Sequence, residues 1–157
     1  MTLSLNQFAP NVPLPGMYVY VANLPQLHNV IVNSSQVTAL AAGAVVKLYG
    51  SSTNTNAPEV VQAGVSDNVF GVVTYNPIKN AFAANERVAI ARENDVVWMP
   101  AAGEIAAGAT VYFNSSNKVT SSGSSGNSML GRALTKAAAE GDMVQIELHF
   151  TKVAAAS

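Results

Sequence analysis

The chain has 157 residues, of which 49% are hydrophobic and only 11% are charged, with a net charge of −1 and no cysteine. This length allows one large domain, or a domain with an arm, and the missing cysteine excludes disulfides and thiolate metal sites. The few Lys and Arg residues are scattered singly, which argues against a nucleic-acid partner, and no apolar run approaches the ~20 residues of a membrane-spanning helix.

Residues 1–35 carry no Lys, Arg, Asp or Glu and contain four prolines, which exclude a long helix over the first half of this segment. We expect an extended N-terminal arm with one short strand at residues 17–22. Five side chains are too apolar for a free tail and are the predicted protein-interface residues: Phe8, Leu14, Met17, Tyr18 and Tyr20. Two arrangements remain open, because the arm can contact neighbouring subunits or add an edge strand to its own domain. No secretory signal peptide is expected.

The chain then repeats one phrase four times, the last copy more weakly. Two small residues precede Gly or Asn, Val follows three positions later, and a large apolar residue stands two positions after that Val. The repeats cover residues 40–48, 82–90, 105–113 and 138–146. Gly and Asn tolerate a positive φ angle. The predicted structural turns are therefore Gly43, Asn85, Gly108 and Gly141.

A strand follows each predicted turn, because apolar residues alternate with other residues there. The predicted core consists of Val46, Leu48, Phe70, Val72, Val88, Ile90, Val111, Phe113, Val144, Ile146 and Leu148. Further strands are expected at residues 69–75 and 96–99, single helical turns at 81–84 and 135–139, and a mobile hairpin and loop at 114–128. Gly71 and Gly131 each interrupt an apolar strand, which indicates a bulge or a close approach of two backbones.

These patterns predict a mainly β fold, namely a β-barrel or sandwich of short strands with an extended N-terminal arm. The expected division is an arm at residues 1–35, a β-barrel domain at residues 36–153, and a C-terminal tail at residues 154–157.

Residues suited to catalysis do not gather in any recognisable motif. The two histidines, His28 and His149, are too few for a metal site, and the closest carboxylate pair, Glu93 and Asp95, lies beside Arg92 and is expected to form a loop ion pair. No nucleophile elbow or phosphate-binding loop is present. We expect no enzymatic activity, no cofactor and no metal.

The repeated turn-strand phrase and its closing form resemble the cement, or head decoration, proteins of tailed phages. In that form Leu130-Gly131-Arg132-Ala133 precedes an Ala-rich turn and then Gly141-Asp142-Met143-Val144, and the resemblance covers roughly residues 36–150. It implies a β-barrel, binding to the major capsid protein on the outside of an assembled capsid, synthesis in the host cytoplasm, and self-association, often as a trimer. The low charge also suits protein contacts, because little charge is desolvated on association.

Two other functions remain open. One is a structural protein of a phage tail, fibre or baseplate, which shares the low charge and the β content. The other is a β-clip-like ligand-binding module or enzyme, since similar turns and strands occur there.

Overall fold

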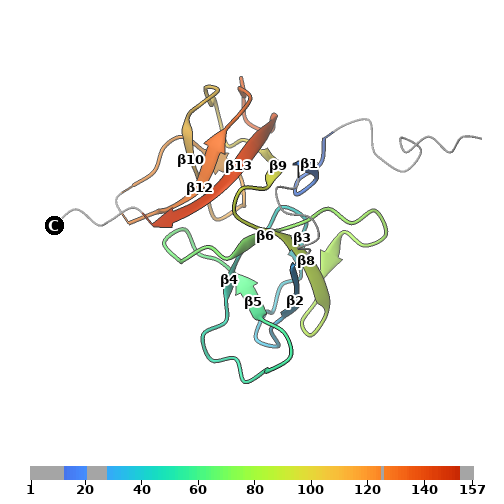
Figure 1. The fold of residues 1–157 in the computed structure, drawn as a ribbon. Helices are drawn as coiled ribbons and strands as arrows, with labels where there is room; N and C mark the ends of the chain where they lie inside the picture. The colour runs from blue at the N-terminus through green and yellow to red at the C-terminus, as the bar shows by residue number, and fades with distance from the viewer. Residues whose placement is uncertain (1–12, 21–27, 125, 153–157) are drawn as a thin grey trace, which may run out of the picture.

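The computed structural model describes residues 13–20, 28–124 and 126–152, and every regular element within them is a strand (Figure 1). The predicted mainly β fold is confirmed. The strands are β1 (Tyr18–Tyr20), β2 (His28–Val32), β3 (Leu40–Ala41), β4 (Val45–Leu48), β5 (Glu59–Gln62), β6 (Gly71–Val73), β7 (Ala81–Phe82), β8 (Arg87–Ala91), β9 (Val96–Pro100), β10 (Thr110–Phe113), β11 (Val119–Thr120), β12 (Ser128–Ala133) and β13 (Met143–Lys152).

The first half of the fold is a closed barrel with the strand order β2-β5-β4-β6-β8. Its neighbours are antiparallel except for β2 and β5, which run parallel and pair Val32 with Val60. A separate two-stranded ribbon pairs β3 with β7.

The second half is a six-stranded sheet with the order β1-β9-β13-β12-β10-β11. A parallel bridge between Ala101, which follows β9, and Val119 of β11 links two strands that lie far apart in this order. Strands β9 to β13 therefore curl into a second barrel, and β1 adds to its outside. Figure 1 shows the two groups of strands one above the other.

The two halves repeat the same pairings in the same register. In each half the strands match in chain order, so that β2, β4, β5, β6 and β8 correspond to β9, β10, β11, β12 and β13. The matching pairs are Val30–Val88 with Met99–Val144, Val46–Gly71 with Val111–Gly131, Val73–Ile90 with Ala133–Ile146, and the parallel pairs Val32–Val60 with Ala101–Val119. The fold is therefore an internal duplication.

The four repeats of the sequence form the turns of this duplication. All four predicted turn residues have positive φ angles, of 84° at Gly43, 68° at Asn85, 84° at Gly108 and 89° at Gly141. Each turn residue donates its N–H to a carbonyl of a distant strand, and the residue that bears this carbonyl donates its own N–H back to the residue after the turn. The four residues held in this way are Val73, Val32, Ala133 and Ala101, with N···O distances of 2.7–2.9 Å.

Two apolar cores fill the barrels. The first contains Val30, Val46 and Ile90, and the second contains their counterparts Met99, Val111 and Ile146. The second core also includes residues of the first barrel, namely Val45, Ala63, Val72 and Ala91, so the two barrels share an apolar contact.

Most of the predicted core is buried, but two residues differ. Leu48 is 48% exposed because it lies at the end of the first barrel, and Phe70 is only half-buried. The Arg92 guanidinium lies 3.8 Å from the centre of the Phe70 ring, where it covers a face that the core leaves open.

Three other expectations need correction. The predicted arm ended at residue 35, but β2 is a barrel strand in which Val30 and Val32 are buried, so residues 28–35 belong to the folded part. Neither predicted helical turn forms, because Ala81 and Phe82 pair with β3 and Ala137 pairs with Ile105. Tertiary strand pairing overrides the helical preference of these short Ala-rich segments. The predicted tail at residues 154–157 lies outside the described residues.

Candidate contact surfaces

The last part of the predicted arm crosses from one barrel to the other. Gly16 donates its N–H to the Trp98 carbonyl at 2.8 Å, Trp98 donates to the Met17 carbonyl at 2.9 Å, and Tyr75 of the first barrel donates to the Gly16 carbonyl at 3.0 Å. A Cβ atom at Gly16 would lie 2.3 Å from the Val73 carbonyl oxygen, so only glycine fits between the barrels here.

The structure brings the described interface residues together along this crossing. Leu14, Met17 and Tyr18 are half-buried, and Tyr20 pairs with Val96 through its backbone. The sequence left open whether this segment contacts neighbouring subunits or adds an edge strand to its own domain. In the structure β1 is an edge strand of its own sheet. Phe8 lies outside the described residues.

Tyr18 packs over the first barrel although its backbone belongs to the second. Its hydroxyl lies 3.5 Å from the Ile90 carbonyl oxygen, a long hydrogen bond. Burial, together with the negative charge of Asp95, raises the pKa of the Tyr18 hydroxyl to about 12.

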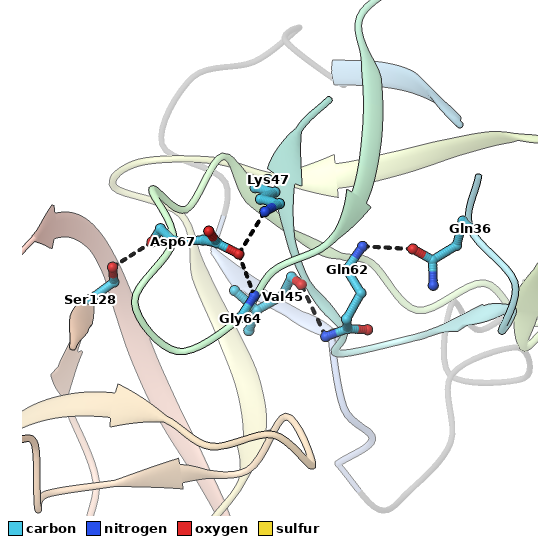
Figure 2. Close-up of polar contacts among 7 residues, drawn as sticks. All are labelled: Gln36, Val45, Lys47, Gln62, Gly64, Asp67 and Ser128. Carbon is cyan, nitrogen blue, oxygen red and sulfur yellow. Dashed lines mark hydrogen bonds and ion pairs between the residues drawn. The ribbon is translucent and has the colours of Figure 1, made fainter. Parts of the chain in front are cut away.

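A polar contact fastens the barrels on another side (Figure 2). Ser128 of β12 donates its hydroxyl proton to the carbonyl oxygen of Asp67. The Asp67 carboxylate accepts the Gly64 N–H at 2.7 Å and lies 2.8 Å from the Lys47 ammonium, so the loop that reaches β12 is held by its own side chain.

Asn117 makes a second connection between the barrels. Its side-chain oxygen accepts the backbone N–H of Val45 at 3.0 Å and the Gln62 side-chain amide at 2.8 Å. The same Gln62 amide donates to the Val45 carbonyl, and the Gln62 N–H donates to the Gln36 side chain (Figure 2). The sequence indicated only a Ser- and Asn-rich loop here. Asn117 has a positive φ angle of 57°, a conformation that Asn adopts more readily than most residues.

Two large apolar side chains stand almost entirely in solvent. Val37 is 98% exposed in the loop between β2 and β3, and Ile78 is 94% exposed in the loop between β6 and β7. Sequence reasoning missed both residues. The available signal was a single branched apolar residue inside each polar stretch, at 33–38 and 76–80.

Both loops are held by local hydrogen bonds. Before Val37, the Gln36 side-chain oxygen accepts the Gln62 N–H at 2.9 Å, and the Gln36 amide donates to the Thr38 carbonyl at 2.8 Å. Before Ile78, the Asn76 side-chain oxygen accepts the Ile78 N–H at 2.9 Å. The exposed apolar side chains are therefore presented on preorganised loops.

The carboxylates suited to catalysis act instead as loop supports. Glu93 accepts the Phe150 N–H at 2.6 Å, and Asp95 accepts the Arg92 N–H at 2.9 Å. His149 lies 2.8 Å from the carboxylate of Glu147, whose pKa this contact lowers. Among the described residues, no group of three or more His, Cys, Asp or Glu is placed to hold a metal ion.

No helix long and apolar enough to cross a membrane occurs among the described residues.

Comparison with known proteins assigns this architecture to a family. A family model described as phage cement protein matches residues 26–148. The chain belongs to the phage cement protein family. The match runs from just before β2 to Leu148 of β13, so it takes in both barrels and leaves β1 and the preceding arm outside. No curated protein matches the chain.

Proposed function

We propose that this cement protein binds the outer surface of an assembled phage capsid, contacts the major capsid protein there, and stabilises the shell without catalysing a reaction. Such a protein is made in the host cytoplasm and remains in the finished virion. The family supports the association with capsids, and the described residues offer contacts rather than a catalytic constellation.

The observation that carries the proposal is the pair of exposed side chains Val37 and Ile78 on supported loops of the first barrel. An isolated, fully exposed apolar side chain gains the most from burial in a partner's pocket, about 1.5–3 kcal/mol for Val or Ile. Because hydrogen bonds already hold both loops, little conformational entropy is lost on docking.

The surface charge also suits a lattice of contacts. Four of the described Lys and Arg residues, Lys47, Lys79, Lys118 and Arg132, already pair with carboxylates of the same chain. A surface with few unpaired charges loses little solvation energy when it is covered. Many weak contacts repeated over a shell add up as avidity.

The proposal is tested by adding purified protein to closed capsids that lack it and measuring both co-sedimentation and the temperature of capsid disruption. We expect binding and a higher disruption temperature, and we expect Val37→Ser with Ile78→Ser to weaken both. Leu134→Ser, which removes a 39% exposed apolar side chain from the second barrel, is the matched control. Since closed capsids expose only their exterior, a failure to bind them would overturn the outer-surface assignment.

A further inference from the structure

A groove lies on the outside of the first barrel, where β8 adjoins the loop that follows β6. Its volume of about 480 Å³ falls within the range of roughly 300–1,000 Å³ that binding pockets occupy. Its lining comes from β1, from the loop after β6, and from β2 and β8, and includes Tyr18, Tyr75, Ile78, Asn29, Arg87 and Ala89. The residues of β2 and β8 point outward here, because they alternate along these strands with buried residues of the first core.

The second barrel carries larger side chains where the first barrel forms this groove. The pair Asn29–Ala89 holds the same register position in the first barrel as the pair Trp98–Gln145 in the second. Trp98 and Gln145 are half-buried, so their bulk fills the place where Asn29 and Ala89 leave room. The groove is therefore a feature of these residues and not of the barrel fold itself.

Hydrogen bonds hold the loop beside the groove in place. Thr74 donates both its N–H and its hydroxyl proton to the Ala89 carbonyl, at 3.0 Å and 3.1 Å. Tyr75 donates its N–H to the carbonyl of Gly16, in the segment that crosses between the barrels, at 3.0 Å. A partner that enters the groove therefore meets a preorganised surface and loses little free energy in ordering it.

Arg87 gives the groove a positive charge that no described residue neutralises. Its side chain is exposed and forms no ion pair within the described part of the chain. The neighbouring Glu86 carboxylate is already occupied, because it accepts hydrogen bonds from the Lys79 ammonium and from the N–H of Ala83. An Arg guanidinium pairs with a carboxylate through two parallel hydrogen bonds, so the groove favours a ligand that carries a carboxylate.

We propose, on the basis of the capsid binding proposed above, that this groove binds a segment of the major capsid protein in which an apolar side chain lies next to Asp or Glu. The carboxylate of that segment pairs with Arg87, and its apolar side chain packs against Tyr18, Tyr75 and Ile78. Aromatic residues and Arg are enriched among the side chains that dominate binding energies. The groove presents both kinds together.

A second copy of this chain is a poor occupant, because its own carboxylates are already engaged. All of its Asp and Glu residues lie in the described part of the chain, and there only Glu104 accepts no hydrogen bond or ion pair. The apolar neighbour of Glu104 is Ile105, which is 1% exposed. Glu104 therefore does not present the exposed apolar side chain that the groove also requires, and a separate protein is the better partner.

Binding to closed capsids that lack the protein tests the groove, with the dissociation constant measured at several salt concentrations. We expect Arg87→Gln to weaken binding about 10- to 100-fold, the loss typical of a hydrogen bond to a charged group, and to make binding less sensitive to salt. Ala89→Gln introduces the residue that the second barrel carries at the matching position, so it should block the groove without unfolding the barrel. Lys136→Gln and Ala107→Gln make the same two changes at exposed positions of the second barrel and should bind like the wild-type chain.

The outcomes separate the groove from the proposed function. Capsids that bind the wild-type chain and both groove variants equally well would overturn the groove assignment and leave the proposed function standing. Capsids that bind none of these chains would overturn the proposed function, and the groove assignment with it. Sedimentation of the free protein should be the same for the wild-type chain and for Arg87→Gln, and a changed oligomeric state would assign the groove to contacts between copies instead.

Carbodiimide cross-linking identifies the occupant on capsids saturated with an Arg87→Lys variant. The new ammonium keeps the positive charge, and carbodiimide joins it through an amide bond to a carboxylate in direct contact. We expect mass spectrometry to find position 87 joined to an Asp or Glu of the major capsid protein, and we expect Ala89→Gln in the same chain to abolish this cross-link. A cross-link from position 87 only to a second copy of the chain, or none to the capsid protein, would show that the assigned occupant is wrong.

Discussion

Leu48 and Phe113 hold matching positions at the ends of β4 and β10, yet Leu48 is 48% exposed and Phe113 is 2% exposed. Replacing Phe113 with Ala should lower the free energy of unfolding by about 3–5 kcal/mol, because it empties a filled core. Leu48→Ala should cost about 1 kcal/mol or less, because that side chain remains half in solvent. Urea unfolding of both variants measures the difference, and equal losses would contradict the assigned packing.

Replacing glycine with alanine should lower the stability of the fold by different amounts at Gly131 and at Gly108. A Cβ atom at Gly131 would lie 2.0 Å from the Glu147 carbonyl oxygen, at the irregular register between β12 and β13. Gly131→Ala should therefore destabilise by about 3 kcal/mol or more, because backbone must move. Gly108 has open space around it and a φ angle of 84°, so Gly108→Ala should cost only about 1 kcal/mol of backbone strain. Gly108→Asn should be milder still, and thermal unfolding ranks the three variants.

Asn117 tests the polar connection between the barrels. Asn117→Gly keeps the positive φ angle but removes the oxygen that accepts the N–H of Val45, a fully buried residue. An unpaired buried N–H should lower stability by about 1–3 kcal/mol. Asn85→Gly is the matched control, because its side chain makes no hydrogen bond to the described residues, and its effect should stay within about 0.5 kcal/mol. A similar loss in both variants would show that the connection contributes nothing.

Tyr18 gives the fold a dependence on alkaline pH. Its folded-state pKa of about 12 lies above the ordinary value of 10.0, so the neutral hydroxyl is favoured by folding. The resulting stability is complete below pH 10 and is lost as pH rises towards 12. In a spectrophotometric titration, Tyr18→Phe should remove one phenolate that forms near pH 12. The wild-type chain should also lose stability faster than this variant between those pH values.

The sequence predicts the local parts of this fold better than their assembly. Alternation places Val46 and Val111 on interior faces, and the Gly or Asn of each repeat forms a positive-φ turn, because these features depend on neighbouring residues. Which strand each turn contacts depends on pairings across the whole chain. The four repeats therefore do not by themselves predict that the strands form two barrels.

The errors have the same origin. Leu48 follows the same pattern as Phe113, and only the packing at the end of each barrel separates them. The sequence predicts an arm up to residue 35 because the segment before the first repeat is uncharged and contains four prolines, whereas β2 is defined by its partners in β5 and β8. The exposure of Val37 and Ile78 and the contacts of Asn117 leave little signal in the sequence, since each is a single residue in a polar loop.

Two truncations separate the arm from the fold. Deleting residues 2–12 leaves the Gly16, Met17 and Trp98 hydrogen bonds in place, so the melting temperature should stay near that of the full chain. Deleting residues 2–20 also removes β1 and the Tyr18 ring, which packs over the first barrel. That loss should lower stability by about 2–4 kcal/mol, from buried apolar area and lost backbone hydrogen bonds together. Differential scanning calorimetry compares the two, and circular dichroism checks that each retains its β structure.

If the shorter deletion already lowers the melting temperature as far as the longer one, residues 2–12 stabilise their own molecule. A shorter variant that melts normally but no longer self-associates assigns the arm to contacts between molecules.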